Sequence, residues 1–525
     1  MGQLVGSIPS PLNGSIRKVL KLTAVFSCLA LGLCYAGSVS AGSSVTVDAN
    51  FYPTLGSPTR ALATADNSYV LVSLTGPAAG VQVFERSDFT TNPCGSGTRK
   101  IIQFPPRNGK SANFVTSVQG MQFLPAPQGV SVGAAVEHQG AEFFSLSDLS
   151  TCAIDGKDNV VNVPQPPSQS PSVCSNLRGN CAPGSFDLAV TPNGAPGYAF
   201  VANEYGLKRL GENGLAPPDV NLGLVGTIGI IKIRRNSAGG FTSGTRSSDQ
   251  NKYIYVPGGG TLPGVTISHD GKRLYVVTEG APRNEIDKKT GNPYWDPTNV
   301  TSTPNGGTQA SQNCQSGESD SKGNLSIVNN GLLSIIDVDK AERGAGQSSI
   351  LVTIASGCVP VRVAETADGK TIWVAARGLN LNLPVQPGKG GTGYQVLAFD
   401  VSKLLSKSLN EVNDALVGFG DSGGTAPVGL ALFNNDQMLA VANSNRFFAP
   451  KAGATDVAIL DVSNPQSPTV IKTIPPTPTS EDMFPRDVTL GPQNVGDCLA
   501  DSGCFTLYVP NFQANMLEVI KAQVN

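Results

Sequence analysis

The chain has 525 residues, including 60 Gly and 38 Pro; 14% of the residues are charged, and the formal net charge is −2. The excess of helix breakers excludes a helical bundle or coiled coil, and an apolar share of 40% excludes a disordered chain. The near-neutral charge argues against a dedicated nucleic-acid binder, and two His residues leave little room for histidine-based metal sites. We therefore expect a loop-rich β protein.

The N-terminus has the pattern of an export signal. Basic residues precede the apolar run 22–36, and small residues ending at Ala41 follow it. The run is shorter than the roughly 20 residues that a membrane span needs. We expect residues 1–41 to be removed, leaving 42–525 as a single domain that is secreted or periplasmic and has no membrane segment.

The cysteines fit an exported protein. Eight of them lie beyond the predicted leader, and an even number in an exported chain indicates disulfides. Two pairs are close enough in sequence to close their own loops, and no CxxC-type spacing points to a bound metal. The expected pairs are Cys174/Cys181 and Cys498/Cys504, with Cys94/Cys152 and Cys314/Cys358 as the remaining pairings.

One sequence pattern recurs seven times after the leader. Each copy has a turn with Pro or Gly, a short apolar strand, a polar turn, a second strand that often ends in Val-x-Asn, and a third strand. A fourth strand is readable in six copies. In chain order, the copies begin at Pro58, Gly120, Ser185, Leu262, Pro360, Pro427 and Phe484.

The last copy ends at Asn525 without a fourth strand. The segment 44–49, just past the leader, is a β-type sequence without a partner and is expected to pair with this last unit. Four antiparallel strands per unit, repeated seven times, predict a seven-bladed β-propeller of the all-β class, closed by this N-terminal strand. The alternative is two separate β domains, which fits the even distribution of the repeats less well.

The repeats resemble those of a known family. The Val-Ala-Asn, Val-Pro-Asn and Ala-Asp-Gly-Lys elements, with Pro at the starts of blades, are similar to those of YVTN-type propellers. That family includes exported bacterial proteins similar to YncE, and it neighbours the seven-bladed lactonases. The resemblance covers nearly the whole mature chain, and it implies a fold much more specifically than an activity, which in such propellers ranges from lactone hydrolysis to surface binding.

Polar residues recur at one position of the innermost strands, near the mouth of the expected channel. The structural interpretation of such charges is that Arg–Asp pairs tie blades together, because a charge near the axis needs a partner or water. The functional alternative is an anion or carboxylate site with Arg60 and Arg362 as donors, which the adjacent Arg486 could join. Aligned by their first polar turns, the seven positions are Arg60, Gln122, Asp187, Gly264, Arg362, Gly429 and Asp487.

A second set of polar residues follows the ends of the second strands. Its asparagines are expected to cap turns through their side-chain amides. The alternative is a Ca²⁺ site built from the oxygens of Glu137, Asn203, Asn443 and Asn511, although no calcium-loop sequence is present. Neighbouring members of the predicted ligand-binding set are Glu279 and Arg377.

Two functions remain open at this stage. The favoured one is a binding scaffold, monomeric and without a cofactor, that takes a small molecule or a protein partner at its mouth and long loops. The alternative is a lactonase-like hydrolase of a lactone or ester, in which Glu137 and His138 supply the base and the arginines hold an oxyanion. His269 lies in a Ser-His-Asp-Gly turn and is expected to be a solvated turn residue.

Overall fold

The structure is a computed structural model of the whole chain. It describes residues 44–76, 79–87, 89–91, 101–102, 117–125, 130–137, 140–148, 153–154, 159–161, 185–192, 197–203, 226–235, 241–243, 253–256, 262–279, 285–286, 293–294, 330–378, 394–408, 411–412, 414–444, 455–476, 483–493, 498 and 503–525. The predicted leader, residues 1–41, and the expected cleavage site after Ala41 lie outside these residues.

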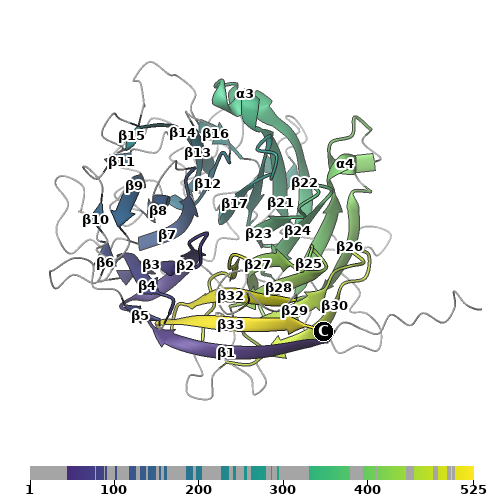
Figure 1. The fold of residues 1–525 in the computed structure, drawn as a ribbon. Helices are drawn as coiled ribbons and strands as arrows, with labels where there is room; N and C mark the ends of the chain where they lie inside the picture. The colour runs from purple at the N-terminus through teal and green to yellow at the C-terminus, as the bar shows by residue number, and fades with distance from the viewer. Residues whose placement is uncertain are drawn as a thin grey trace, which may run out of the picture. The chain divides into compact units, whose positions relative to one another are not determined.

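The described chain is built from antiparallel sheets that follow one another along the sequence (Figure 1). Two sets of strands, joined by the single pair Thr75–Ser117, come first. The first set is β2 (Ser57–Ala63), β3 (Tyr69–Thr75), β4 (Gly80–Glu85), β5 (Thr90–Thr91) and β6 (Ile101–Ile102). The second is β7 (Ser117–Phe123), β8 (Val130–Glu137), β9 (Gly140–Asp148), β10 (Ala153–Ile154) and β11 (Asn159–Val161).

The next two sheets have the same order of strands from the inside outward. One consists of β12 (Ser185–Val190), β13 (Tyr198–Asn203), β14 (Thr227–Arg235), β15 (Phe241–Ser243) and β16 (Tyr253–Tyr255). The other consists of β17 (Gly264–Ile267), β18 (Arg273–Thr278), β21 (Asn330–Asp337) and β22 (Ile350–Cys358). A separate small pair, β19 (Glu285–Ile286) and β20 (Pro293–Tyr294), lies between β18 and β21 in sequence.

Three four-stranded sheets complete the chain. The first is β23 (Pro360–Glu365), β24 (Thr371–Ala376), β25 (Gln395–Asp400) and β26 (Leu416–Asp421). The second is β27 (Pro427–Phe433), β28 (Met438–Asn443), β29 (Val457–Asp461) and β30 (Thr469–Ile474). The third has the order β31 (Thr489–Leu490), β32 (Cys504–Asn511), β33 (Met516–Val524) and β1 (Val45–Pro53).

The outer strand of the last sheet comes from the other end of the chain. β1 pairs with β33 along its whole length, from Val45 opposite Val524 to Pro53 opposite Met516. Figure 1 shows β1 lying alongside β33. The segment 44–49, which the sequence left without a partner, therefore supplies the fourth strand of the last repeat.

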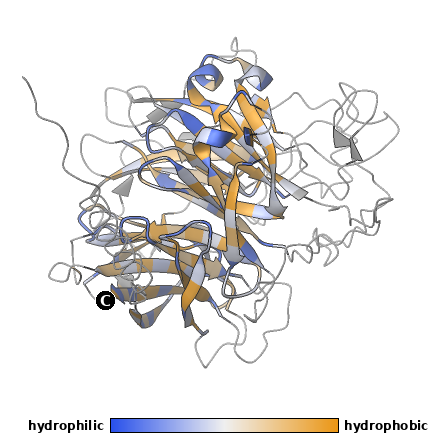
Figure 2. Ribbon diagram, turned by 90° about the vertical axis from the view of Figure 1, so that its right-hand side faces the viewer, coloured by the Kyte–Doolittle hydropathy of each residue, from blue (hydrophilic) through white to orange (hydrophobic). Residues whose placement is uncertain are grey.

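Burial explains why the middle strands are almost continuously apolar. Every residue of β28 is buried, and so are six of the seven residues of β3, because these strands are covered on both faces by neighbouring sheets. Outer strands such as β30 are mostly half-buried or exposed. Figure 2 shows the hydrophobic stretches along the strands.

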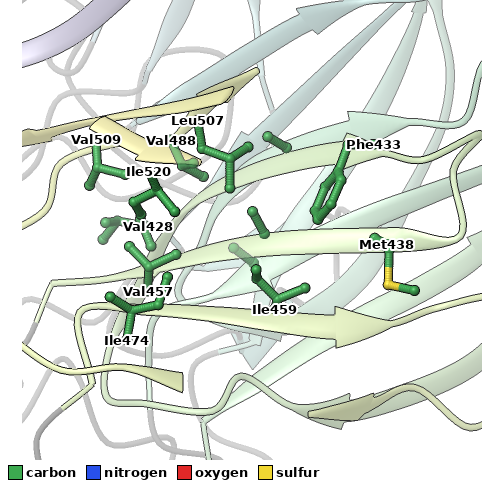
Figure 3. Packing of buried hydrophobic residues seen from close by; sticks show 14 of the residues in the cluster. Val428, Phe433, Met438, Val457, Ile459, Ile474, Val488, Leu507, Val509 and Ile520 are labelled. Atoms are coloured by element: carbon green, nitrogen blue, oxygen red, sulfur yellow. The ribbon is translucent and has the colours of Figure 1, made fainter. Parts of the chain in front are cut away.

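The largest described core cluster lies between the sheet of β27–β30 and the last sheet. Figure 3 shows Val428 and Val457 from one sheet beside Val509 and Ile520 from the other. Each fully buried side chain of this size stabilises the fold by roughly 1.5–3 kcal/mol. The sheets are therefore held face to face by apolar packing rather than by backbone hydrogen bonds.

The innermost strands of the sheets touch one another in sequence order. β2 contacts β7, β7 contacts β12, and the series continues through β17, β23, β27 and β31. β31 and β32 in turn contact β2. Five of these strands contain a register shift near their start, in β2, β7, β12, β23 and β27. Such bulges turn one extra side chain out of the regular alternation.

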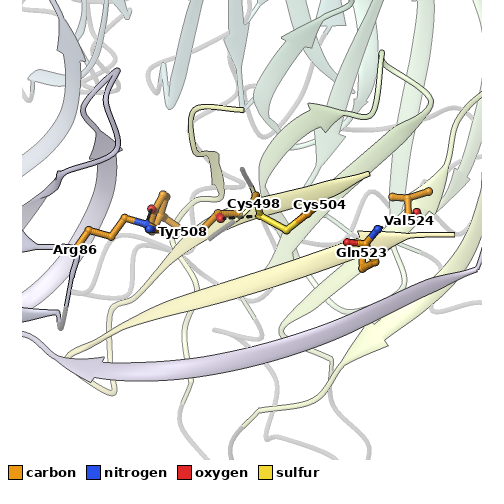
Figure 4. The surroundings of a disulfide bond; sticks show 7 residues. Arg86, Cys498, Cys504, Tyr508, Gln523 and Val524 are labelled. Carbon is orange, nitrogen blue, oxygen red and sulfur yellow. Dashed lines mark hydrogen bonds between the residues drawn. A yellow bond between two sulfur atoms is a disulfide. The ribbon is translucent and has the colours of Figure 1, made fainter. Parts of the chain in front are cut away.

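Polar contacts join the last sheet to the first. The Tyr508 hydroxyl donates to Asn67 Oδ1 at 2.9 Å, and Arg86 Nε donates to the Tyr508 oxygen at 3.2 Å. Figure 4 shows Arg86 beside Tyr508, and the Cys498–Cys504 disulfide, whose Cys504 begins the strand β32 that contains Tyr508. This disulfide confirms one predicted pair. Cys358 is also disulfide-bonded, whereas Cys94, Cys152, Cys174, Cys181 and Cys314 lie outside the described residues.

Helices are minor elements in the described part of the chain. α3 (Val338–Glu342) and α4 (Val401–Leu404) each follow a third strand, and each begins at an aspartate whose carboxylate accepts hydrogen bonds from the first turn. A short 3-10 turn, η4, spans Gly346–Ser349. Among the described residues, no helix is both long and apolar enough to cross a membrane.

Candidate functional site

Four of the predicted inner-strand residues form one network of ion pairs. Arg60 contacts Asp187 at 2.8 Å and Asp487 at 2.7 Å. Arg362 contacts the same two carboxylates, Asp187 at 3.0 Å and Asp487 at 3.6 Å. Each carboxylate thus lies between both guanidiniums, and the contacts join β2, β12 and β23 to the segment before β31. This inner network, as we call Arg60, Asp187, Arg362 and Asp487, corresponds to the expectation of Arg–Asp pairs that tie blades together.

The network is buried and electrically balanced. The two aspartate side chains are 1% and 3% exposed, and those of Arg60 and Arg362 are 18% and 11% exposed. Burial disfavours the charge on Arg60, but the attraction and hydrogen bonds of Asp187 and Asp487 outweigh it, so the pKa of Arg60 is raised above its ordinary value. The two arginines are therefore committed to protein carboxylates, which restricts any role as donors to an anionic ligand.

Glycines make room for the inner network. Gly120, Gly264 and Gly429 occupy the corresponding positions of β7, β17 and β27, so charged residues and glycines alternate from one innermost strand to the next. A Cβ on Gly120 would lie 2.6 Å from Asp187 Oδ1, and a Cβ on Gly429 would lie 2.8 Å from the Asp487 Cα. A larger residue at Gly120 or Gly429 would therefore collide with an aspartate of the inner network.

The predicted position of Gln122 is wrong by two residues. The bulge in β7 lies between Val118 and Gly120, which places Gly120 and not Gln122 at the position of Arg60. Gln122 lies two residues farther along β7, opposite Gly133. Its Oε1 accepts a hydrogen bond from the Val190 backbone at 2.8 Å, so it links β7 to β12. The alignment failed because the second copy, which has no Pro at its start, was taken to begin at Gly120, whereas Val118 occupies the position of Pro58.

Arg486 lies beside the inner network and has aromatic surroundings. Its guanidinium carbon is 5.5 Å from the ring centroid of Phe186, 5.3 Å from that of Phe484 and 5.6 Å from that of Phe512. These distances are within the range of cation–π contact. Arg486 Nη2 also donates to Gln119 Oε1 at 3.3 Å. The residue that the sequence offered as an additional anion donor is thus stacked among rings from separate elements.

The bulges explain how these side chains meet. Gln119 and Phe186 are the bulged residues of β7 and β12, and Arg486 follows the isolated bridge between Pro485 and Asn511 at the start of the last sheet. Each directly precedes a member of the glycine and aspartate positions described above. The corresponding Thr59, Val361 and Val428 are buried, whereas Gln119, Phe186 and Arg486 are half-exposed.

The second predicted set is dispersed among the sheets. Arg377 forms an ion pair with Glu279, which joins the ends of two neighbouring second strands. Asn203 donates to Thr227 Oγ1 at 3.2 Å, within its own sheet. Asn443 donates to the Ser422 carbonyl at 3.3 Å, and Asn511 donates to Glu518 Oε2 at 3.1 Å. Of these three bonds only that of Asn443 reaches backbone, as expected of a capping amide, whereas Asn203 and Asn511 bond side chains of neighbouring strands.

Burial strongly affects the acid that Asn511 contacts. Glu518 is fully buried in β33. Burial raises the pKa of Glu518 to about 8, helped by the negative charge of Asp456 and opposed by the hydrogen bond from Asn511. Glu518 was not singled out from the sequence, because its position in a third strand carries no recurrent motif.

The residues of the predicted hydrolytic pair are not placed. His138 lies outside the described residues, and Glu137 is described only as the end of β8, opposite Ser117. His269 is 60% exposed, in agreement with a solvated turn. Its Nδ1 lies 3.0 Å from Glu365 Oε2, and Glu365 also accepts from the Tyr275 hydroxyl at 2.6 Å, so the turn is tied to the next sheet.

No metal-binding cluster emerges where the structure gives positions. Within the described ranges, no three His, Cys, Asp or Glu side chains gather where they could hold an ion. The four residues of the calcium hypothesis lie at the ends of strands that belong to four different sheets. That hypothesis remains a prediction from sequence.

Sequence reasoning missed the partners of Arg486. Gln119, Phe186, Phe484 and Phe512 carry no motif of their own, and their proximity depends on bulges and on contacts between sheets far apart in sequence. A partial signal was present: Phe186 and Arg486 both immediately precede an inner-strand aspartate.

Comparisons with known proteins identify no relative by sequence. No protein-family model and no curated protein matches the chain. Among solved structures, it is similar to the β-propeller domain of Cps50 (Swd1) from Myceliophteria thermophila, with 8% identity, a TM-score of 0.46, and coverage of 90% of this chain and 99% of that one. It is also similar to hydrazine synthase of Kuenenia stuttgartiensis, with 14% identity, a TM-score of 0.45, and coverage of 89% and 95%.

The class of the fold follows from the chain's own sheets. Repeated antiparallel sheets, each with its first strand innermost and with successive innermost strands in contact, define a β-propeller. No activity follows from this class, because propellers carry many unrelated functions.

Proposed function

We propose that this chain is an exported, seven-bladed propeller, similar to YVTN-type proteins, that binds a ligand or a protein partner at the mouth of its channel. Seven innermost strands in serial contact support the blade count, and the contact of β31 with β2 supports a closed ring. The pairing of β1 with β33 supports closure by an N-terminal strand. The predicted leader and the Cys498–Cys504 disulfide favour a secreted or periplasmic location.

The inner network is the observation that carries the binding function. In the hydrolase hypothesis, Arg60 and Arg362 would hold an oxyanion and would have to be available to it. Instead, each of them contacts two buried carboxylates, and releasing either one would leave a buried charge without its partner. The network therefore acts as a rigid base of the mouth, above which the bulged residues and the long loops can present a binding surface.

A hydrolysis panel separates the two functions. The purified protein is incubated with aliphatic lactones, aryl esters and phosphate-free buffer controls, with and without added Ca²⁺, and His138→Ala is measured alongside it. A binding scaffold predicts no turnover above background in any arm. Turnover that is abolished in His138→Ala would establish the hydrolase and overturn the proposal.

A ligand screen gives the positive evidence. Thermal unfolding of the purified protein is followed against a library of small anions, sugars and aromatic compounds. We expect stabilisation by at least one class of compound, because a ligand that binds only the folded state shifts the folding equilibrium. Stabilisation that survives substitution of every half-exposed residue at the mouth would place binding elsewhere and contradict the proposed site.

A further inference from the structure

We propose that the mouth holds a specific subsite for a planar aromatic carboxylate, formed by Arg486, Gln119, Phe186 and Phe512. This inference rests on the proposed binding function and names the chemical class of the ligand. These four residues are called the Arg486 subsite below. They come from four separate segments, and all four are half-exposed.

The rings hold the guanidinium in position. Phe484 is buried and stacks edge-on against Phe512, with centroids 5.5 Å apart. The Phe512 backbone N–H donates to the Phe484 carbonyl at 2.8 Å, and the Arg486 N–H donates to the Pro510 carbonyl at 3.0 Å. Arg486 is therefore fixed at both its backbone and its side chain, which lowers the entropy that binding would cost.

Gln119 occupies the position expected of a ligand oxygen. Its Nε2 donates to Ser117 Oγ at 2.7 Å, which turns its Oε1 toward Arg486. The resulting bond to Arg486 is 3.3 Å long and uses a neutral acceptor. A carboxylate carries a negative charge, accepts from a guanidinium at about 2.7–2.9 Å, and can take two parallel N–H···O bonds from it. An incoming carboxylate can therefore displace the Gln119 oxygen from Arg486.

The inner network makes the base of the subsite compatible with an anion. Phe186 precedes Asp187 and Arg486 precedes Asp487, so two carboxylates lie one residue away from the subsite. Left alone, they would repel a negatively charged ligand. Both are paired with Arg60 and Arg362, so the charge of that layer is balanced.

The rings select the body of the ligand. Phe186 and Phe512 are half-exposed, and an aromatic ring stacked on them would bury apolar surface beside the carboxylate that contacts Arg486. Aromatic pairs attract one another beyond the effect of the area that they bury. An aromatic acid thus fits the subsite better than acetate, which lacks the ring, or phosphate, which lacks both the ring and the planar shape.

Isothermal titration of the purified protein with sodium benzoate tests the subsite. Benzamide, acetate and inorganic phosphate serve as matched probes that lack the charge, the ring or the planar shape. We expect benzoate to bind at least about tenfold more tightly than any of the other three, because only benzoate combines the charge, the ring and the planar shape. Equal affinity for benzoate and benzamide, equal affinity for benzoate and phosphate, or no heat with millimolar benzoate would each overturn the assignment.

Variants locate the binding. Arg486→Gln should weaken benzoate binding at least tenfold, and Phe512→Leu should weaken it about threefold. Gln119→Leu should leave binding as tight or make it tighter, because it removes the competing acceptor; weaker binding would contradict the exchange. Arg343→Gln, at an exposed arginine that caps α3, is the matched control and should bind benzoate like the unaltered protein.

Failure of the Arg486 subsite can be distinguished from failure of the proposed binding function. If other compounds stabilise the protein in the ligand screen but benzoate does not bind, the binding function stands and the Arg486 subsite is refuted. If Arg486→Gln binds benzoate like the unaltered protein, the subsite is refuted even though the protein binds aromatic acids.

Discussion

The inner network should contribute strongly to stability, and Asp187→Asn tests this contribution. Asp187 accepts from Arg60 at 2.8 Å and from Arg362 at 3.0 Å, and its Oδ1 also accepts from the Leu188 backbone at 2.9 Å. Replacing the carboxylate by an amide removes the charge between two guanidiniums and presents an NH₂ group to one of them. The substitution keeps the size of the side chain, so any cost comes from electrostatics and hydrogen bonding rather than from a cavity.

The expected cost is about 3 kcal/mol in the free energy of unfolding. Removing one partner of a buried ion pair costs about 3–5 kcal/mol. The lower end applies because the side chains of Arg60 and Arg362 keep 18% and 11% exposure and both still contact Asp487. A Coulombic argument alone would give a larger value, but partial exposure lets water compensate part of the lost attraction.

Urea unfolding followed by tryptophan fluorescence and circular dichroism measures this cost. Lys370→Gln is the control, since Lys370 and Asp368 form an ion pair whose side chains are 81% and 53% exposed. An exposed pair contributes about 0–1 kcal/mol. The double variant Arg60→Gln with Asp187→Asn should be less destabilised than the sum of the two single variants, by about 1 kcal/mol or more. If Asp187→Asn costs no more than Lys370→Gln, the network does not hold the sheets together.

Three further predictions follow from the same structure. Gly264→Ala should lower the free energy of unfolding by about 1–3 kcal/mol, because its Cβ would lie 2.4 Å from the Val361 carbonyl oxygen. The controls for an added methyl group are Gly76→Ala and Gly346→Ala, at glycines with open space around them and φ angles of +85° and +57°. A smaller loss of stability at position 264 than at both controls would refute the clash. Glu518 has a folded pKa of about 8 against an ordinary value of 4.5, so below pH 4.5 it is protonated in both the folded and the unfolded protein. Its stabilising contribution is lost as the pH rises from 4.5 to 8, because the unfolded protein then releases a proton that the folded protein keeps. The difference in free energy of unfolding between the unaltered protein and Glu518→Gln should fall by up to about 4 kcal/mol over this range, and a flat difference would contradict the raised pKa. Deleting residues 44–50 should sharply lower the melting temperature, because β33 would lose the strand that pairs with it, and an unchanged melt would contradict the closing role of β1.

Much of the fold could be predicted because its signals are local. β23 and β27 begin at Pro360 and Pro427, and Pro58 is the second residue of β2. The polar turns and the apolar second strands mark the other boundaries of the repeats. The missing strand of the last repeat could also be predicted, since an unpaired strand edge needs a partner and one β-type segment remained unassigned.

The candidate site was predictable only in part. The recurrence of charge at one position identified Arg60, Asp187, Arg362 and Asp487, and all four meet in the structure. The alternation with glycine was hidden, because the second copy was taken to begin two residues too late, which assigned Gln122 to the position that Gly120 occupies. The rings around Arg486 could not be found, because two bulges and two sequence-distant sheets bring them together.

Hydrogen–deuterium exchange of the purified protein with and without benzoate tests the Arg486 subsite most directly. Bound benzoate should slow exchange in peptides that contain Gln119, Phe186 and the stretch from Phe484 to Phe512, while peptides that contain the His269 turn should be unchanged. Slowed exchange at the His269 turn, or unchanged exchange in all three mouth segments at a saturating concentration of benzoate, would contradict the subsite.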